Sequence, residues 1–220
     1  MTTRGPLFEG VSEEEGARLL ERARRRSFAT GEVVFHAGDP ADTLHLIQRG
    51  RFAVRVTTEF GDVATLNVIG AGDFFGELAL LSPRAPRSAT IIALEPAETL
   101  SVHELDFNRL RSERPETADV LIAILSAQVR RLSGHLAEAL YVPADTRVRR
   151  RLLDMADVYR DEDPVVVVPL TQEELASMAG TSRATVNRVL REEEDFGTIT
   201  LSRGRTTVTD SDGLRRRAFP

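Results

Sequence analysis

The spacing of apolar residues changes near Pro115, and that change limits the folds open to this chain. Between Gly31 and Val102 the apolar runs are short, and turns that contain glycine separate them. From Pro115 to Pro143 the apolar residues instead recur at every third or fourth position, with no proline in between. Alternation over a few residues indicates strands, and the longer period indicates a helix. The pattern predicts a β domain followed by one long helix.

Six short runs are predicted strands, at residues 32–35, 44–47, 52–56, 63–69, 89–93 and 99–102. Strands of this length and turn spacing are typical of an all-β jelly roll or barrel. A helix over residues 10–26 is expected to precede them, with Ser12 as its N-cap and Glu15 completing a capping box. Polar turns are predicted at residues 60–62 and 161–164.

Residues 74–90 carry the residue types that a phosphate site without a metal requires. Such a site needs backbone N–H donors, a fixed positive charge and little side-chain obstruction. Gly76 permits close approach of the backbone, and Arg87 offers a two-pronged cation. Glu77 would repel a phosphate, so we expect it to accept a hydrogen bond from a ribose hydroxyl. The candidate ligand-binding residues are Gly76, Glu77, the amides of Leu78 and Ala79, Arg87 and the hydroxyl of Ser88.

The long helical segment has a seam of apolar residues with heptad spacing. Its members, alternately four and three residues apart, are Ala118, Ile122, Leu125, Val129, Leu132, Leu136 and Ala139. Over about three heptads this pattern favours a parallel two-fold dimer helix. The alternative is an amphipathic helix packed on its own domain. A further helix at 146–157 and a strand at 165–168 are predicted after Pro143.

The last third of the chain contains the pattern of a helix-turn-helix. Thr171 and Glu174 form a capping box that opens a short helix. A turn containing Gly180 follows, and Thr181 or Ser182 then caps a second helix. The alternative is a plain helical hairpin, which would predict nothing about the solvent face of the second helix.

In a helix-turn-helix the N-terminal residues of the second helix meet base edges. Arg183 and Arg188 can each bind a guanine bidentately, with about 1–3 kcal/mol of discrimination apiece. Helix starts suit phosphate oxygens, as does the basic tip of a β-hairpin wing predicted after the second helix. The candidate DNA-binding residues are Thr171, Gln172 and Ser182 at helix starts, Arg183, Ala184, Asn187 and Arg188 on the second helix, and Arg203 and Arg205 at the hairpin tip.

Two motifs carry a resemblance to a known family. Phe-Gly-Glu-Leu-Ala followed by Pro-Arg-Ser-Ala, within residues 74–90, resembles the phosphate-binding cassette of cyclic-nucleotide-binding domains. Together with the helix-turn-helix, the order of elements resembles the CRP/FNR superfamily of bacterial transcription regulators over almost the whole chain. The resemblance implies an α+β fold with an N-terminal β jelly-roll barrel, a long central dimerisation helix and a C-terminal winged helix-turn-helix. It implies a sensor domain at 1–114, a dimerisation helix and hinge at 115–145 and a DNA-binding domain at 146–220.

Two positions depart from the relatives that respond to cAMP. Those relatives usually have Glu beside the first recognition arginine, where this chain has Ala184; Glu accepts from cytosine N4, so the change should alter one operator position. They also carry a Thr-Ser pair on the dimer helix that contacts the adenine. Counting without gaps from Pro115 places Leu132 and Ser133 there. Ser133 is thus an implied ligand contact, whereas Leu132 can neither donate nor accept.

The resemblance implies a homodimeric, sequence-specific transcription regulator whose affinity for DNA is set by a cyclic nucleotide between barrel and dimer helix. No cofactor is required, and cAMP or cGMP is the implied effector. The implied partners are double-stranded DNA with an inverted repeat, a second copy of the chain and RNA polymerase. Two alternatives stay open: DNA binding without a nucleotide or with another small effector, and a nucleotide-binding interaction module that binds no DNA.

Composition excludes several other classes of protein. Cysteine is absent, which removes disulfides, Cys-ligated iron–sulfur clusters and thiol redox sensing. No catalytic motif and no metal-ligand spacing is evident, so we expect neither an enzyme nor a metal site. No apolar run approaches the ~20 residues of a membrane span, and we expect a cytoplasmic protein. The net charge is −5, and residues 147–220 contain 13 Arg against 13 acidic residues, so DNA binding must come from local placement of charge.

Overall fold

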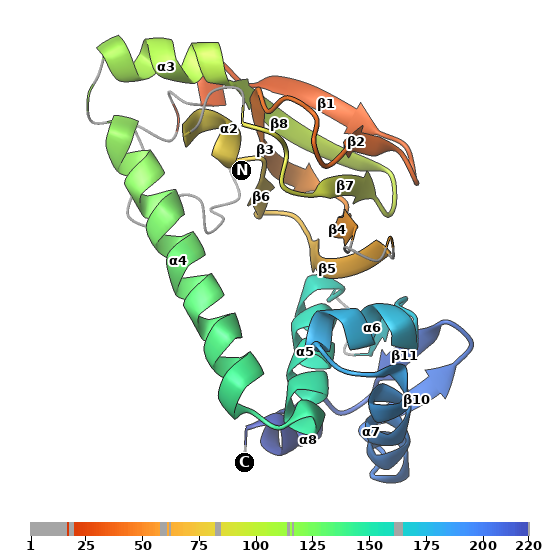
Figure 1. The fold of residues 1–220 in the computed structure, drawn as a ribbon. Coiled ribbons are helices and arrows are strands. Elements are labelled where there is room, and N and C mark those ends of the chain that lie inside the picture. The colour runs from red at the N-terminus through yellow and green to blue at the C-terminus, as the bar shows by residue number, and fades with distance from the viewer. Residues whose placement is uncertain are drawn as a thin grey trace. The chain divides into compact units, whose positions relative to one another are not determined.

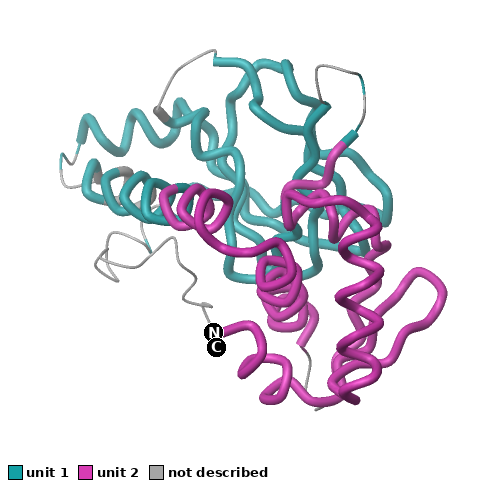
Figure 2. The backbone as a smooth tube through the Cα atoms, turned by 60° about the horizontal axis from the view of Figure 1, so that its bottom comes forward, with its two compact units in different colours: residues 1–63, 67–132 teal, residues 64–66, 133–220 magenta. Residues whose placement is uncertain are grey.

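The computed structural model describes residue 17 and residues 20–57, 61, 63–81, 85–113, 115, 117–160 and 165–219. The predicted caps Ser12 and Glu15, turn residues 60 and 62, and the loop at 161–164 lie outside these residues. Figure 2 shows the chain as two compact units, one of residues 1–63 and 67–132 and one of residues 64–66 and 133–220.

Two four-stranded sheets form most of the first unit (Figure 1). The strand order in one sheet is β1 (Arg24–Phe28), β8 (Ala97–His103), β3 (Thr43–Arg49) and β6 (Phe74–Phe75). The order in the other is β2 (Val33–Phe35), β7 (Thr90–Ala93), β4 (Phe52–Thr57) and β5 (Val63–Ile69). The registers of β1–β8, β3–β8, β3–β6, β2–β7 and β4–β7 are antiparallel. The predicted β-barrel fold is confirmed.

Three phenylalanines lie in the core of this unit, because alternate residues of each strand point to the same face. The Phe52 ring lies 5.7 Å from the Phe28 ring and 5.2 Å from the Phe75 ring, measured between centroids. A second buried cluster joins the sheet to helix α3 (Glu104–Glu113); its members are Leu44, Leu46, Leu80, Val102, Phe107 and Leu110.

The N-terminal part of the unit differs from the prediction. Leu20 and Glu21 are helical, but the expected helix over 10–26 stops before Arg24, where β1 begins. Arg24 pairs with Ser101 of β8, so a strand contact far along the chain overrides the local helical preference. Helix α3 and strand β6 are also absent from the prediction, since neither has a local pattern strong enough to mark it.

Helix α4 (Thr117–Tyr141) confirms the predicted long helix. Its heptad seam is largely exposed, and the large apolar members Ile122, Leu125, Val129, Leu132 and Leu136 are 38–61% exposed. A contiguous apolar face of this kind normally marks an interaction surface. No helix in the described part of the chain is both long enough and apolar enough to cross a membrane.

The second unit combines helices with a three-stranded sheet. The helices are α5 (Ala144–Val158), α6 (Gln172–Ala179), α7 (Arg183–Asp195) and α8 (Ser211–Ala218), and the sheet order is β10 (Ile199–Ser202), β11 (Arg205–Val208) and β9 (Val166–Val168). Between α6 and α7 the chain turns at Gly180, whose φ is 59°. The predicted winged helix-turn-helix is confirmed, with α5 beginning two residues earlier than expected and α8 as an addition.

Candidate ligand and nucleic-acid sites

The turn at the start of the cassette requires glycine at position 76. Gly76 has a φ of 80°, in the left-handed region that favours glycine. A Cβ at this position would lie 2.6 Å from Thr43 O and 2.7 Å from Arg87 Nη1. The backbone can therefore approach the guanidinium of Arg87 only because no side chain stands between them.

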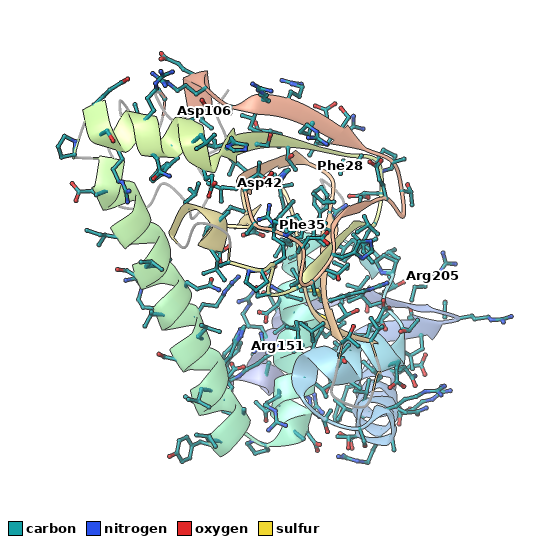
Figure 3. The ribbon with its side chains drawn as sticks, turned by 45° about the horizontal axis from the view of Figure 1, so that its top comes forward. Phe28, Phe35, Asp42, Asp106, Arg151 and Arg205 are labelled. Carbon is teal, nitrogen blue, oxygen red and sulfur yellow. The ribbon has the colours of Figure 1, made fainter. Side chains whose placement is uncertain are left out.

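A fixed set of acceptors holds Arg87 inside the barrel unit. Its Nη1 donates to Thr43 O at 2.8 Å, and its Nη2 donates to Thr43 Oγ1 at 2.9 Å and to Asp42 Oδ1 at 3.1 Å. The guanidinium carbon lies 3.9 Å from the centre of the Phe35 ring. Figure 3 labels Phe35 and Asp42 in this region of the barrel. These contacts fix the orientation of the fork before any ligand arrives.

The positive charge of Arg87 is only partly offset by these contacts. Its ion-pair partner Asp42 is 57% exposed, and Arg87 Nε is buried without a hydrogen-bond partner among the described residues. Burial lowers the pKa of Arg87 more than the carboxylates of Asp42, Asp39 and Glu77 raise it. An anion beside the guanidinium would supply the missing compensation. The residues present therefore fit a phosphate group.

A buried histidine supports the same network from the barrel interior. His45 Nε2 lies 3.2 Å from Thr43 Oγ1, and its Nδ1 lies 3.0 Å from Thr99 Oγ1. Because Thr43 Oγ1 donates to Asp42 Oδ1 at 3.0 Å, it accepts from Nε2–H, and Nδ1 accepts from Thr99. Burial, followed by the charge of Arg87, lowers the pKa of His45 to about 4. The ring is therefore neutral near pH 7 and adds no charge beside Arg87.

One of the two amides predicted to bind phosphate already has a partner within the chain. Ala79 N–H donates to Gly76 O at 3.1 Å, because residues 76–79 form the turn that opens the short helix α2 (Leu78–Leu81). Ala79 is therefore not a free donor in this state. Leu78 begins α2, and its N–H donates to no backbone carbonyl of the described residues, so its contact with a phosphate stays a prediction.

The remaining predicted ligand contacts lie at different depths. Glu77 is half-buried, and Ser88 is exposed directly after the buried Arg87. Ser133 is exposed on α4. Contacts of these three side chains with a ligand stay predictions.

Both helices of the helix-turn-helix begin with side-chain caps. Thr171 Oγ1 accepts from Glu174 N at 3.2 Å and Glu174 Oε2 accepts from Thr171 N at 2.9 Å, which confirms the capping box. Ser182, rather than Thr181, caps α7 by accepting from Thr185 N at 3.2 Å. The predicted apolar contact between the helices is buried, and its members are Leu175, Ala176, Val186, Val189 and Leu190.

Most side chains predicted to face DNA are exposed. The exposed ones are Thr171, Ser182, Arg183, Ala184, Asn187, Arg188, Arg203 and Arg205. Gln172 is half-buried, and its Oε1 accepts from Asn187 Nδ2 at 3.4 Å, so these two predicted contacts lie together. Arg203 lies in the turn of the wing, and Arg205 begins β11 (Figure 3).

The two arginines predicted to read guanine have different surroundings. Arg188 Nη2 donates to Asp145 Oδ1 at 2.6 Å, and its Nη1 donates to Glu192 Oε1 at 2.7 Å. The hydrogen bond that Arg188 donates to Asp145 is the main reason that the pKa of Arg188 is raised, and the same bond lowers the pKa of Asp145. Arg183, in contrast, forms no ion pair within the residues that the structure describes.

Sequence reasoning did not assign four residues to these sites: Phe35, Asp42, Thr43 and Asp145. Asp42 is 45 positions from Arg87, and Asp145 is 43 positions from Arg188. Each pair meets only through tertiary packing, so the local motif that contains the arginine does not reveal its carboxylate partner.

Comparison with known proteins assigns a family to both parts of the chain. A model of the cyclic nucleotide-binding domain matches residues 25–114. A model of the Crp-like helix-turn-helix domain matches residues 146–217. The two matches cover the Arg87 cassette and the α6–α7 motif respectively.

Whole-length relatives agree with these matches. The chain is 31% identical to a CRP-like cAMP-activated global transcriptional regulator of Mycobacterium tuberculosis, over 98% of this chain and 97% of the relative. It is 32% identical to a cyclic AMP receptor protein of Thermus thermophilus, over 97% of each. A crystal structure of a CRP/FNR-family transcriptional regulator, also from Thermus thermophilus, aligns with a TM-score of 0.74 at 25% identity, over 90% of this chain and 99% of that one. The chain therefore belongs to the CRP/FNR family of DNA-binding transcription regulators.

Proposed function

We propose that this chain is a homodimeric transcription regulator whose affinity for an inverted-repeat operator is set by a cyclic nucleotide. The observation that carries the proposal is the buried and incompletely compensated guanidinium of Arg87 beside Gly76. A cyclic phosphodiester supplies one negative charge without a metal and suits this pair. Glu77 accepts from the ribose hydroxyl, and Ser88 donates to the phosphate. Relatives of similar length that are named as cAMP-activated or as a cAMP receptor support the assignment.

The DNA contacts are proposed to lie on the second unit, with α7 as the recognition helix. Arg183 and Arg188 donate to guanine acceptors, while Ala184 and Asn187 line the rest of the reading face. The phosphate contacts come from Thr171, Gln172, Ser182, Arg203 and Arg205. The acidic side chains of the same unit do not oppose this function as strongly as their number suggests, because Glu192 and Glu193 are paired with arginines inside the unit.

The partner proposed for the exposed seam of α4 is a second copy of the chain. A heptad seam fits an identical parallel helix, and a two-fold dimer would read half-sites about 34 Å apart. The functional division proposed is a sensor at 1–114, a dimer helix and hinge at 115–145 and a DNA-binding part at 146–220. RNA polymerase is the further partner, the cell compartment is the cytoplasm, and the chain acts without catalysing a reaction, as its relatives are regulators.

The proposed effector site is tested by titrating labelled cAMP and cGMP into the wild type and into Arg87→Ala. We expect saturable binding to the wild type and a loss of about 10- to 100-fold in the variant, since a charge-assisted fork is removed. Arg109→Ala, an exposed arginine on α3, is the control and should bind as the wild type does. Equal binding by all three proteins, or binding by none, would remove the nucleotide from the proposal.

A second candidate keeps the DNA binding but replaces the effector. It rests on Leu132, which offers no hydrogen bond at the position where the resemblance implies base recognition. In this case the chain binds its operator without a nucleotide, or responds to another small molecule. Operator affinity measured with and without cAMP and cGMP separates the two candidates, because an unchanged affinity favours the second.

A further inference from the structure

Helices α5 and α7 meet through two rows of complementary charge. Asp145 and Arg149 are four residues apart on α5, and Arg188 and Glu192 are four apart on α7, so each pair lies on one helix face. Asp145 binds Arg188 at 2.6 Å, Arg188 binds Glu192 at 2.7 Å, and Glu192 binds Arg149 at 3.0 Å. We call these four side chains the charge ladder.

The charge ladder is anchored at one end and open at the other. Arg149 is buried, and its Nε also donates to the fully buried Glu193 at 2.6 Å. Arg188, at the other end, has a side chain that is 53% exposed. The exposed arginine is therefore connected through carboxylates to the interior of the unit. Its guanidinium is held before any partner approaches.

The ladder leaves Arg188 with enough donors to read a base. An arginine has five N–H groups, and the two bonds to Asp145 and Glu192 use one N–H on each terminal nitrogen. Three N–H groups remain, and a bidentate contact with guanine O6 and N7 needs two. Asp145 thus restricts the plane and position of the Arg188 guanidinium without using all of its N–H donors.

Restriction of this kind favours one acceptor pattern over others. A free arginine can turn toward any phosphate or base edge, and it loses the rotamer freedom of a long side chain when it binds. A held fork has already lost most of that freedom, so it gains most from a paired acceptor that matches its plane. Guanine offers such a pair in the major groove.

We propose that Asp145 is a specificity-determining residue that positions Arg188 for guanine. The inference rests on the proposed role of α7 as the recognition helix. Asp145 acts through Arg188 and need not touch DNA itself. Its negative charge also disfavours complexes in which Arg188 leaves the ladder for a phosphate, because Asp145 would then face the DNA backbone unpaired. Arg183, which has no ion pair among the described residues, has no such constraint.

The experiment begins with an operator selected from a random duplex pool by the wild-type protein, with and without cAMP. Affinities are then measured for every single-base variant of that operator, using wild type, Arg183→Ala and Arg188→Ala. The position at which Arg188→Ala loses its preference for guanine identifies the base pair that Arg188 reads. Arg183→Ala identifies the other position in the same way and provides an internal reference.

Asp145→Asn is expected to lower the guanine preference at the Arg188 position by about two- to five-fold per protomer, the range for an exposed ion pair. The preference at the Arg183 position should stay unchanged. Asp157→Asn is the matched control, because it removes the same charge from α5 at a site that faces Arg160 and Arg215. It should change neither preference. In the background of Arg188→Ala, Asp145→Asn should have no further effect on base preference.

Each other outcome overturns part of the account. If Asp145→Asn leaves the guanine preference intact, Asp145 does not position Arg188, and if it increases the preference, Asp145 competes with DNA for Arg188. In either case this inference fails, while the operator itself still supports the proposed function. The same holds if Arg188→Ala alters no base preference. A wild type that selects no operator overturns the proposed function and the inference together. Asp145→Ser, a residue suited to an early helical position, repeats the test should Asp145→Asn melt below the wild type.

Discussion

Two buried arginines, Arg87 in the first unit and Arg149 in the second, have opposite charge balances. Arg149 donates to Glu193 at 2.6 Å and to Glu192 at 3.0 Å, so two carboxylates surround one guanidinium. Arg87 donates mainly to a carbonyl and a hydroxyl of Thr43, and its one ion-pair partner among the described residues is the exposed Asp42. Burial alone does not show whether the charge of an arginine is matched. The number and type of its hydrogen-bond and ion-pair partners do.

The acidic partner in the second unit shows the same contrast. Burial of Glu193 would raise its pKa, but hydrogen bonds from Arg149, Arg217 and Thr198 lower it below its ordinary value. That cluster is closed, with each charge matched by another. The Arg87 cluster is open, because the pKa of Arg87 is lowered by burial that its neighbours do not offset. An added phosphate would balance the charge of the Arg87 cluster, whereas the Glu193 cluster has no unmatched charge for it to balance.

The largest effect is expected from Glu193→Gln, which opens the closed cluster. The neutral amide leaves Arg149 and Arg217 without their shared carboxylate, and breaking a buried ion pair costs about 3–5 kcal/mol. Chemical denaturation of the full chain, followed by a signal from the second unit, measures the loss. Glu194→Gln is the control, since Glu194 pairs with the exposed Arg191 and should cost under about 1 kcal/mol. Similar costs for both variants would contradict the closed-cluster description.

The next effect is a dependence of the stability of the barrel unit on pH, caused by protonation of His45. The pKa of His45 is about 4 in the folded chain, against an ordinary value of 6.5, so the folded state disfavours the added proton. The contribution of the neutral His45 ring to the free energy of unfolding is fully present above pH 6.5. It is lost as the pH falls from 6.5 toward 4, and the loss is on the order of 3 kcal/mol.

His45→Gln removes that titration and should flatten the stability curve across this window, whatever its cost at pH 7. The measurement is the free energy of unfolding at several pH values between 7.5 and 4.5 for both proteins. Carboxylates titrate in the same range, so the difference between the two curves is the relevant quantity. Parallel curves would mean that His45 is protonated without penalty and that the Arg87 cluster tolerates a second buried charge.

A smaller effect distinguishes the glycine beside Arg87 from an ordinary turn glycine. Gly76 and Gly31 share a φ of 80°, but a Cβ at Gly31 meets nothing within 4 Å, whereas one at Gly76 meets Thr43 O at 2.6 Å. Gly31→Ala should cost about 1 kcal/mol from backbone strain, and Gly76→Ala about 1–3 kcal/mol more from the clash. Nucleotide binding, measured alongside stability, should be lost in Gly76→Ala alone. Equal costs and equal binding would contradict the close approach to Arg87.

Local chemistry explains which parts of this molecule the sequence predicts. The capping box of Thr171 and Glu174, the turn at Gly180 and the helix between Pro115 and Pro143 depend on residues within a few positions of one another. The placement of Arg87 in a cassette is predictable for the same reason, because Gly76 and Glu77 lie in the same short segment. Turn chemistry and hydrophobic period carry this information along the chain itself.

The unpredicted features depend on distant partners. Strand β1 forms because Arg24–Phe28 pairs with β8, although residues 24–26 belong to the predicted helix. The hydrogen bond between Asp145 and Arg188 joins two helices and two residues that are 43 positions apart, and neither local segment predicts it. The state of each arginine, open or closed, is therefore a tertiary property. A sequence shows that an arginine is present but not how many carboxylates surround it.

The smallest effect concerns an arginine that is neither buried nor paired. Arg203 lies exposed in the turn of the wing and forms no ion pair among the residues described, so its charge remains available to the DNA backbone. Arg203→Ala should weaken binding to all sequences alike and reduce the slope of log K against log salt by about one per protomer, with stability unchanged within about 0.5 kcal/mol. Arg191→Ala, which removes a charge that is also exposed but is paired with Glu194, should leave the slope nearly unchanged. If both variants shifted the slope equally, the partners of an arginine would not predict its availability, and the contrast between Arg87 and Arg149 would lose its physical basis.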